Sequence, residues 1–174
     1  MWKGKNVTVF VTGGIAAFKA ATLVRLFVKA GANVEVAMTK SACEFITPLT
    51  FQVLTKNKVH TDTFDEDEAD RVQHIHLADK TDVAVVVPAT ANTIAKLANG
   101  IADNFVTSTL LATTAPIYLA PAMNEHMWEN PATVRNVAQV KADGKVVIEP
   151  ATGFLAEGYN GKGRLPEPEE IFEQ

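Results

Sequence analysis

The sequence predicts an α/β protein with a doubly wound parallel sheet, Rossmann-like or flavodoxin-like, in a single domain of residues 1–174. Short β-branched apolar segments alternate along the chain with segments of helical spacing. Glycine or small polar residues follow most of the strand-like segments, as expected where a buried strand gives way to a helix. Hydrophobic residues make up 47% and charged residues 21% of the chain, a balance typical of a globular protein with a core.

The first third of the chain predicts a β-α-β unit. Residues 6–12 (NVTVFVT) form a β-branched apolar run that Gly13-Gly14 ends, which indicates a buried parallel strand. Residues 15–30 have apolar side chains at helical spacing, Ile15 and Phe18 among them, and residues 33–38 (NVEVAM) predict a second strand. Such a unit favours a parallel sheet with right-handed crossovers.

The same alternation continues to residue 149. The most strand-like stretch, DVAVVVP, lies in this part, and Asp103 is the residue that we expect to cap one of the helices. The predicted elements are strands at 82–88, 116–120 and 145–149 and helices at 91–98, 103–111 and 131–142.

Two segments interrupt the alternation. Residues 61–70 (TDTFDEDEAD) are acidic and predict an exposed loop. Residues 152–166 (TGFLAEGYNGKGRLP) hold four glycines and show no periodicity. We expect this second segment to be a mobile flap, because long segments without regular structure are usually functional or disordered.

Four short motifs with small or hydroxyl-bearing residues follow predicted strands. Ligands of open α/β sheets bind beyond the carboxyl ends of the strands, where helix N-termini favour phosphate groups. We therefore expect a ligand site where these motifs meet. The motifs are Thr12-Gly13-Gly14, Thr39-Lys40-Ser41, Pro88-Ala89-Thr90-Ala91-Asn92 and Pro121-Ala122-Met123-Asn124.

The glycine turn does not have the pattern of a dinucleotide site. Gly13-Gly14 lacks the third glycine of G-x-G-x-x-G, and the second strand ends without an acidic residue for a ribose. A mononucleotide with one phosphate fits better than NAD or ATP. Tight packing between strand and helix is the alternative explanation of this turn.

His74 and His76 are candidate site residues just before the strand at 82–88. A metal site needs further ligands at a recognisable spacing, and the sequence offers none, so no metal is expected. An imidazole titrates near neutral pH, which suits it to act as a base.

The composition limits the binding partners and the cellular compartment that we expect. The formal net charge of −4 gives no broad basic surface, so nucleic acid is not an expected partner. Cys43 is the one cysteine, which suits a reducing cytoplasm. No apolar run approaches the roughly 20 residues that span a bilayer. We expect a cytoplasmic protein without a membrane segment.

The motifs together resemble the homo-oligomeric flavin-containing cysteine decarboxylases over nearly the whole chain. The order of an HIxL histidine, a PxMNxxMW motif and a glycine-rich flap is specific to this family. The residues that carry the resemblance are Thr12-Gly13-Gly14-Ile15-Ala16-Ala17, His74-Ile75-His76-Leu77, residues 88–93, residues 121–128 and Gly161-Lys162-Gly163-Arg164-Leu165.

The resemblance implies bound FMN and a substrate that ends in cysteine, whose thiol is oxidised before CO2 is lost. It assigns the base role to His74 and substrate binding to Asn124, and it implies a homotrimer or an assembly of trimers with flavin at the subunit interface. Trp128 is expected in the core. The implied flavin residues are Gly14, Ile15, Thr39, Thr90 and Asn92 around the phosphate and ribityl chain and Ala122 and Met123 near the isoalloxazine ring.

The flap departs from the pattern of the family members that act in coenzyme A synthesis. Those members carry a cysteine for the final reduction, where this chain has Glu157. Our hypothesis is that Glu157 donates the late proton in its place, with Tyr159 as the alternative. Lys80 is a weak candidate for binding the substrate carboxylate.

Two substrates and one non-enzymatic function remain open. The leading expectation is oxidative decarboxylation of 4'-phosphopantothenoylcysteine to 4'-phosphopantetheine, by a carboxy-lyase of coenzyme A synthesis. A peptide with a C-terminal cysteine, of the lantibiotic type, is the alternative substrate. A non-catalytic flavoprotein regulator is a further alternative.

Overall fold

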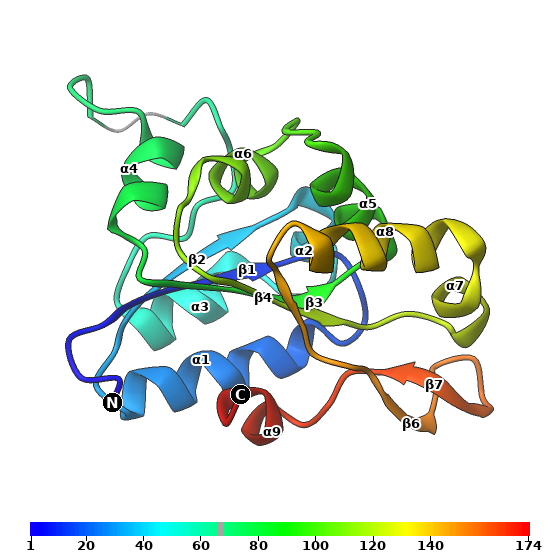
Figure 1. Cartoon of the computed structure of the whole chain (residues 1–174). Helices are drawn as coiled ribbons and strands as arrows, with labels where there is room; N and C mark the ends of the chain where they lie inside the picture. The colour runs from blue at the N-terminus through cyan, green and yellow to red at the C-terminus, as the bar shows by residue number, and fades with distance from the viewer. Residues whose placement is uncertain (66–67) are drawn as a thin grey trace.

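The computed structural model describes residues 1–65 and 68–174. In this part of the chain a parallel sheet of five strands has the order β2-β1-β3-β4-β5 (Figure 1). This is the flavodoxin-like order, with its switch point between β1 and β3. The predicted doubly wound class is therefore confirmed. The strands are β1 (Asn6–Val11), β2 (Asn33–Met38), β3 (Val83–Ala89), β4 (Ile117–Pro121) and β5 (Val146–Val147).

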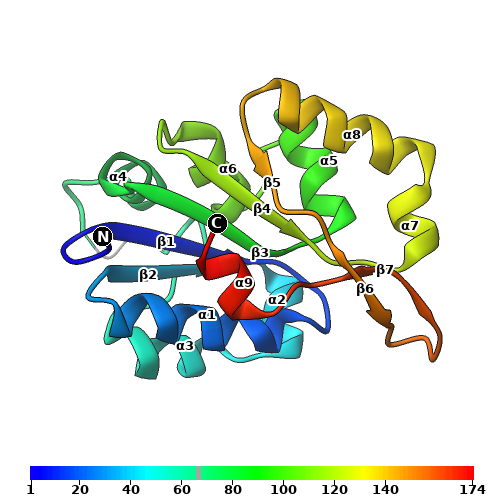
Figure 2. The same ribbon diagram turned by 60° about the horizontal axis from the view of Figure 1, so that its bottom comes forward.

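Helices cover both faces of the sheet (Figures 1 and 2). On one face lie α1 (Ala17–Lys29), α3 (Pro48–Thr55) and α9 (Pro168–Phe172). On the other face lie α4 (Gln73–Lys80), α5 (Ala91–Asn99), α6 (Phe105–Ala112) and α8 (Pro131–Ala142). The short helices α2 (Lys40–Phe45) and α7 (Glu125–Glu129) follow β2 and β4 at the carboxyl edge.

A hydrophobic core fills each space between the sheet and a helical layer. Successive side chains of a strand point to opposite faces. Val9 of β1 thus packs with Leu23 and Phe51 on one side, whereas its neighbour Phe10 packs with Phe105 on the other. The two layers fix the carboxyl edge of the sheet, where the predicted motifs lie.

Several elements differ from those predicted. The strand expected at 145–149 is reduced to two residues, and the helices α2, α3, α4, α7 and α9 were not predicted. The described part of the acidic segment 61–70 is irregular, and residues 66 and 67 lie outside the described residues.

The N-cap of α6 is Asn104, and the prediction of Asp103 was wrong. Asn104 Oδ1 accepts a hydrogen bond from the Thr107 N–H at 2.8 Å, and Thr107 Oγ1 accepts from the Asn104 N–H at 3.2 Å. Asp103 instead accepts from Lys96 Nζ at 2.9 Å. Both side chains can cap a helix, and the reciprocal bond to Thr107 favours Asn104.

The segment 152–166 contains a β-hairpin, so the expected lack of regular structure in this segment was wrong. Strands β6 (Ala151–Phe154) and β7 (Asn160–Arg164) pair antiparallel beside α7 (Figure 2). We call residues 151–164 the hairpin. Its glycines hid the strand pattern, because glycine has no side chain to alternate between faces.

None of the helices in the described ranges is long and apolar enough to cross a membrane.

Candidate active site

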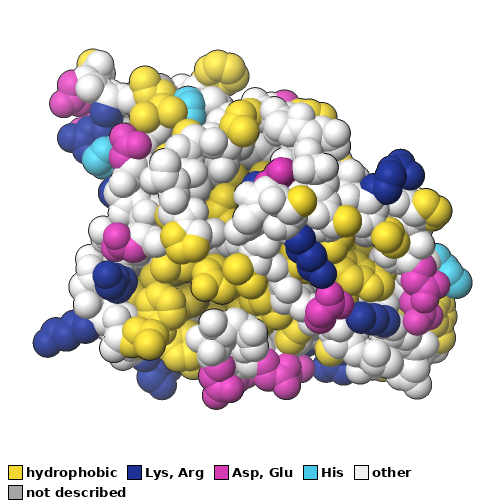
Figure 3. Space-filling view, in the orientation of Figure 1, with side chains coloured by type: hydrophobic (Ala, Val, Ile, Leu, Met, Phe, Trp, Pro, Cys, Tyr) yellow, Lys and Arg dark blue, Asp and Glu magenta, His cyan; other side chains and the backbone are white. Residues whose placement is uncertain are grey.

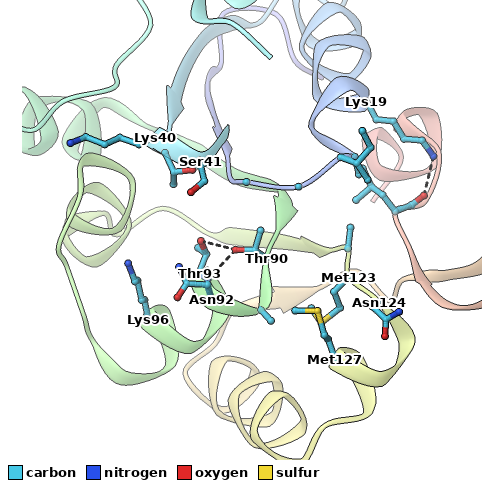
Figure 4. Close-up of a pocket in the computed structure, with 18 of the residues that line it drawn as sticks. Lys19, Lys40, Ser41, Thr90, Asn92, Thr93, Lys96, Met123, Asn124 and Met127 are labelled. Carbon is cyan, nitrogen blue, oxygen red and sulfur yellow. Dashed lines mark hydrogen bonds between the residues drawn. The ribbon is translucent and has the colours of Figure 1, made fainter. Parts of the chain in front are cut away.

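A cavity of about 1020 Å³ opens at the carboxyl edge of the sheet. All four predicted motifs contribute residues to its lining, and Figure 4 labels residues of three of them, which come from separate elements. Its volume matches the upper range of small-molecule sites. The sequence-predicted site residues that line it are Gly14, Ile15, Thr39, Thr90, Asn92, Ala122, Met123, Asn124 and Glu157.

One wall of the cavity is formed by the glycine turn after β1. A Cβ atom at Gly13 would lie 2.4 Å from Cβ of Ser41, so only glycine fits there. The helix that follows, α1, begins without a hydrogen bond from a capping side chain. A helix N-terminus that faces a cavity and lacks such a cap favours an anion such as phosphate.

A buried hydroxyl group fixes the ends of β1 and β3 next to each other. Thr12 Oγ1 donates to the Pro88 carbonyl at 2.5 Å and accepts from the Thr90 N–H at 3.1 Å. Thr90 in turn caps α5, because its Oγ1 accepts from the Thr93 N–H at 3.1 Å. The start of α5 is thereby held at the cavity.

Another wall is apolar. Met123 and Met127 extend into the cavity region from the segment after β4 (Figure 4). Ile15 and Phe18 line the cavity and remain 61% and 58% exposed. Ile15 precedes α1 and Phe18 lies in its first turn, so both are at the end of the helix that faces the cavity. Flexible thioethers and apolar side chains suit a flat aromatic ligand.

Met123 and Trp128 also contribute to packing. Both are partly buried against the core cluster that contains Phe105. Lys162 Nζ lies 5.9 Å from the centre of the Trp128 ring. Trp128 thus packs against the core but stays partly exposed, so it lies at the edge of the expected core position.

The hairpin closes the cavity from the side of α7. The Met123 N–H donates to the Gly163 carbonyl at 2.9 Å, and the Lys162 N–H donates to Glu125 Oε1 at 3.1 Å. Glu157 lies in the loop of the hairpin, exposed but among the residues that line the cavity.

The base of the hairpin also carries ion pairs. Acidic and basic side chains alternate on the surface between α8 and the hairpin (Figure 3). Glu149 there pairs with Lys141 at 3.3 Å and with Lys162 at 3.0 Å. These exposed pairs hold the pKa of Glu149 below its usual value through the hydrogen bond from Lys162. Such pairs add little stability. The hairpin is therefore held in place mainly by hydrogen bonds of its backbone, such as the bond between Met123 and Gly163.

Asn124 presents its amide to the hairpin in one orientation. Its Oδ1 accepts from the His126 N–H at 2.8 Å, and its Nδ2 donates to Tyr159 Oη at 2.5 Å. The carboxamide oxygen is thus used inside the chain, and the amide offers only donor hydrogens outward.

His74 does not line the cavity of its own chain in the described structure. It lies on α4, and its Nδ1 is buried without a hydrogen-bond partner among the described residues. Its ring meets Phe105 edge-on with a centroid distance of 6.4 Å. Phe105 itself lines the cavity, so His74 packs against a residue of the cavity wall without lining the cavity.

Three other residues considered in the sequence lie away from the cavity. His76 contacts Arg71 at 3.2 Å, and Lys80 is bound to Glu35, so neither faces the other site residues. The proposal of Lys80 for carboxylate binding is therefore not supported by its position. Cys43 lies on α2, where burial and then Glu44 raise the pKa of its thiol, and it is not among the residues that line the cavity.

The sequence analysis missed several contributors to the cavity, Lys19 and residues 61–64 among them. Lys19 Nζ donates to the Leu165 carbonyl at 3.3 Å and to Glu167 at 3.2 Å, with only 12% of its side chain exposed. Residues 61–64 line the cavity although they belong to the acidic segment. No sequence signal pointed to either, because both depend on how distant segments meet.

The fold and the cavity define a class of protein, a doubly wound α/β protein that holds a phosphate-bearing ligand at its switch point. The Flavoprotein family matches residues 1–174, and the chain belongs to that family.

Two relatives set the family context. The chain is 55% identical over 171 residues to the "Coenzyme A biosynthesis bifunctional protein CoaBC" of Bacillus subtilis (strain 168), a match that covers 98% of this chain and 42% of that protein. The chain therefore spans less than half the length of that relative. It is 44% identical over 172 residues to the "Probable phosphopantothenoylcysteine decarboxylase" of Streptococcus mutans, covering 98% and 96% of the two chains.

Solved structures share the fold. A PPC decarboxylase mutant in complex with pantothenoylaminoethenethiol matches with a TM-score of 0.87 and 33% identity, over 98% of this chain and 96% of the other. The FMN-dependent cysteine decarboxylase SpaF matches with a TM-score of 0.81 and 34% identity, over 91% and 90%.

Proposed function

We propose that this chain is an FMN-dependent decarboxylase that converts 4'-phosphopantothenoylcysteine to 4'-phosphopantetheine in coenzyme A synthesis. The observation that carries the proposal is that the glycine turn and the Met123-Asn124 segment line the same cavity. The similarity to the decarboxylase of Streptococcus mutans over almost the full length of both chains supports the substrate.

The cavity fits FMN. The uncapped start of α1 and the close approach of Gly13 to Ser41 suit a phosphate that bonds to backbone N–H groups. Thr39, Thr90 and Asn92 would lie around the phosphate and the ribityl chain, as would Gly14 and Ile15. Ala122 and Met123 would lie against the isoalloxazine ring. Bound FMN supplies the two-electron redox chemistry.

The chain's own residues would bind the substrate and move protons. Asn124 would hold the substrate through its outward donor hydrogens. His74 would accept a proton from the substrate, because a neutral imidazole has a ring nitrogen with a free lone pair. Glu157, at the cavity from the hairpin loop, would return a proton to the product in the last step.

A site built from more than one copy of the chain agrees with the position of His74. His74 does not line the cavity of its own chain, whereas Ile15 and Phe18 leave the cavity wall exposed. We propose a homotrimer, or an assembly of trimers, in which His74 of one copy reaches the cavity of its neighbour. The hairpin would act as the mobile flap over this shared site, and the protein would work in the cytoplasm.

The test is product analysis with FMN-loaded protein. We expect wild-type protein to release CO2 from phosphopantothenoylcysteine and to give phosphopantetheine by mass spectrometry. Glu157→Gln should still release CO2 but accumulate the oxidised enethiol, which is two mass units lighter than phosphopantetheine.

Each outcome separates one part of the proposal. No turnover by wild-type protein would exclude the substrate, and turnover of a peptide with a C-terminal cysteine would then favour the alternative. If Glu157→Gln formed phosphopantetheine at the normal rate, Glu157 would be excluded as the proton donor, and the rest of the proposal would be unaffected.

A further inference from the structure

The side chain of Asn124 can recognise only an acceptor. A backbone N–H can only donate, so the atom that receives the His126 N–H at 2.8 Å is the carboxamide oxygen. The hydrogens on Nδ2 therefore point toward the hairpin loop, where one of them reaches Tyr159 Oη at 2.5 Å. The second hydrogen is not used in either bond.

Tyr159 contributes a second donor next to this amide. It is not itself among the residues that line the cavity, but its hydroxyl lies 2.5 Å from the amide of Asn124, which does line it. A phenol has one hydrogen and two lone pairs, and the bond from Asn124 occupies a lone pair. The phenolic hydrogen is not used in that bond. Because a hydroxyl that accepts a hydrogen bond is polarised, it becomes a stronger donor. Asn124 and Tyr159 thus present two donor hydrogens side by side.

We infer that Asn124 and Tyr159 together bind the carboxylate of the substrate's terminal cysteine, with Tyr159 as the residue that selects a carboxylate there. This inference rests on the proposed function and names the part of the site that recognises the leaving group. A carboxylate offers two acceptor oxygens in one plane, which matches two adjacent donors.

The charged side chains around the cavity favour neutral donors for this task. Lys96 is paired with Asp103, and Lys19 and Arg164 are both paired with Glu167. Lys40 extends away from Asn124 on the other side of the cavity (Figure 4).

Neutral donors also suit the reaction. A free cation would stabilise the carboxylate that the reaction must consume, and ground-state stabilisation of that kind does not speed the step. Two neutral donors bind the carboxylate and stabilise its ground state less than a free cation would.

The experiment compares a carboxylate with its amide. The ligands are 4'-phosphopantothenoyl-alanine, which lacks the thiol and is not consumed, and the same molecule with a carboxamide in place of the carboxylate. Their affinities for the FMN-loaded full chain are measured by titration calorimetry. The variant is Tyr159→Phe. The matched control is Tyr118→Phe, which removes the hydroxyl of the other tyrosine, a half-buried residue of β4 outside the cavity.

We expect Tyr159→Phe to weaken binding of the carboxylate about tenfold and to leave binding of the carboxamide unchanged. The KM for phosphopantothenoylcysteine should rise in the same proportion. Tyr118→Phe should change neither affinity.

Two results would overturn the assignment while wild-type turnover remains intact. If Tyr159→Phe weakened the binding of both ligands equally, Tyr159 would only hold the hairpin in position. Unchanged affinity for both would mean that its hydroxyl does not touch the carboxylate. A wild-type protein that does not turn over phosphopantothenoylcysteine would instead overturn the proposed function, and this assignment with it.

Discussion

At the scale of single residues, the site depends on small side chains and on the orientation of one amide. The sequence predicted the small residues correctly, because glycine and threonine after a buried strand already indicate where a ligand approaches the backbone. It did not predict that Asn124 binds Tyr159, since the contact joins segments 35 residues apart. Nor did it predict that His74 lies outside the cavity of its own chain, because that depends on how α4 packs on α6.

Gly13 allows a prediction at this scale. Gly13→Ala places a Cβ atom 2.4 Å from Cβ of Ser41, so either the turn after β1 or the start of α2 must shift. We expect the affinity for FMN to fall at least tenfold, about 1.4 kcal/mol, because the phosphate would lose its backbone donors. Fluorescence titration of flavin into apoprotein measures this loss.

A second substitution serves as the control. Ser41→Gly in the Gly13→Ala background removes the atom that the new methyl group meets first. We expect it to restore most of the affinity. No restoration would show that the steric contact is not the cause.

At the scale of elements, the strands were predictable and the short helices were not. A run such as VAVVVP carries its own pattern, since a strand buried on both faces is apolar throughout. Helices of five to eight residues, such as α2 and α7, are stabilised by caps and tertiary contacts more than by a periodic pattern. The hairpin escaped prediction because none of the five residues of β7, Asn160–Arg164, has a β-branched or apolar side chain, and two of them are glycine.

The attachment of the hairpin gives a prediction for this element. Gly163 has a φ of 141°, and a Cβ there would lie 2.0 Å from the Met123 carbonyl oxygen. Gly163→Ala should therefore break the backbone bond to Met123 and release the hairpin. We expect limited proteolysis to cut the loop at 155–159 at least tenfold faster than in wild-type protein.

Gly158 provides a matched control for backbone strain. Its φ is 94°, but a Cβ there would have no neighbour within 4 Å. Gly158→Ala thus carries the cost of a positive φ, on the order of 1 kcal/mol, without the collision. Equal proteolysis of the two variants would contradict a specific role of the contact with Met123.

Helix α4 is joined to β2 by a charged cluster that predicts a dependence on pH. Burial alone would raise the pKa of Glu35, but hydrogen bonds from His60 at 2.9 Å and from Lys80 outweigh it and hold the pKa below its usual value. A lowered carboxyl pKa adds stability above the pKa of the unfolded chain. That stability is lost as the pH falls through the pKa of the folded state.

We therefore expect Glu35→Gln to flatten the acid side of the curve of unfolding free energy against pH, between about pH 5 and pH 3. Urea denaturation at a series of pH values measures the curve. Glu129→Gln, an exposed residue at the end of α7, is the control and should leave the slope unchanged. An unchanged slope for Glu35→Gln would show that the cluster does not couple to folding.

At the scale of the whole molecule, the position of His74 predicts that catalysis requires neighbouring copies. His74 and Asn124 do not line one cavity within a chain. Mixtures of His74→Asn and Asn124→Asp chains should therefore regain activity that neither variant has alone. In a random 1:1 mixture about one quarter of the shared sites carry both native residues.

The measurement is decarboxylation by co-expressed, differently tagged variants. Activity near a quarter of the wild-type level supports a shared site. Complete inactivity of mixed assemblies, shown by both tags to be present together, would place both residues at one site in the same chain.

The aromatic cluster of Trp2, Phe27 and Phe172 has a practical consequence for the molecule. Trp2 and Phe172 lie 6.1 Å apart and both rest near Phe27 of α1. Residue 2 precedes the amino end of β1, whereas the cavity opens at the carboxyl ends of the strands. Both ends of residues 1–174 thus emerge together, away from the cavity (Figure 1). An affinity tag, a fluorescent reporter or a surface anchor fused at either end would leave access for small molecules open, so immobilised protein should keep its turnover.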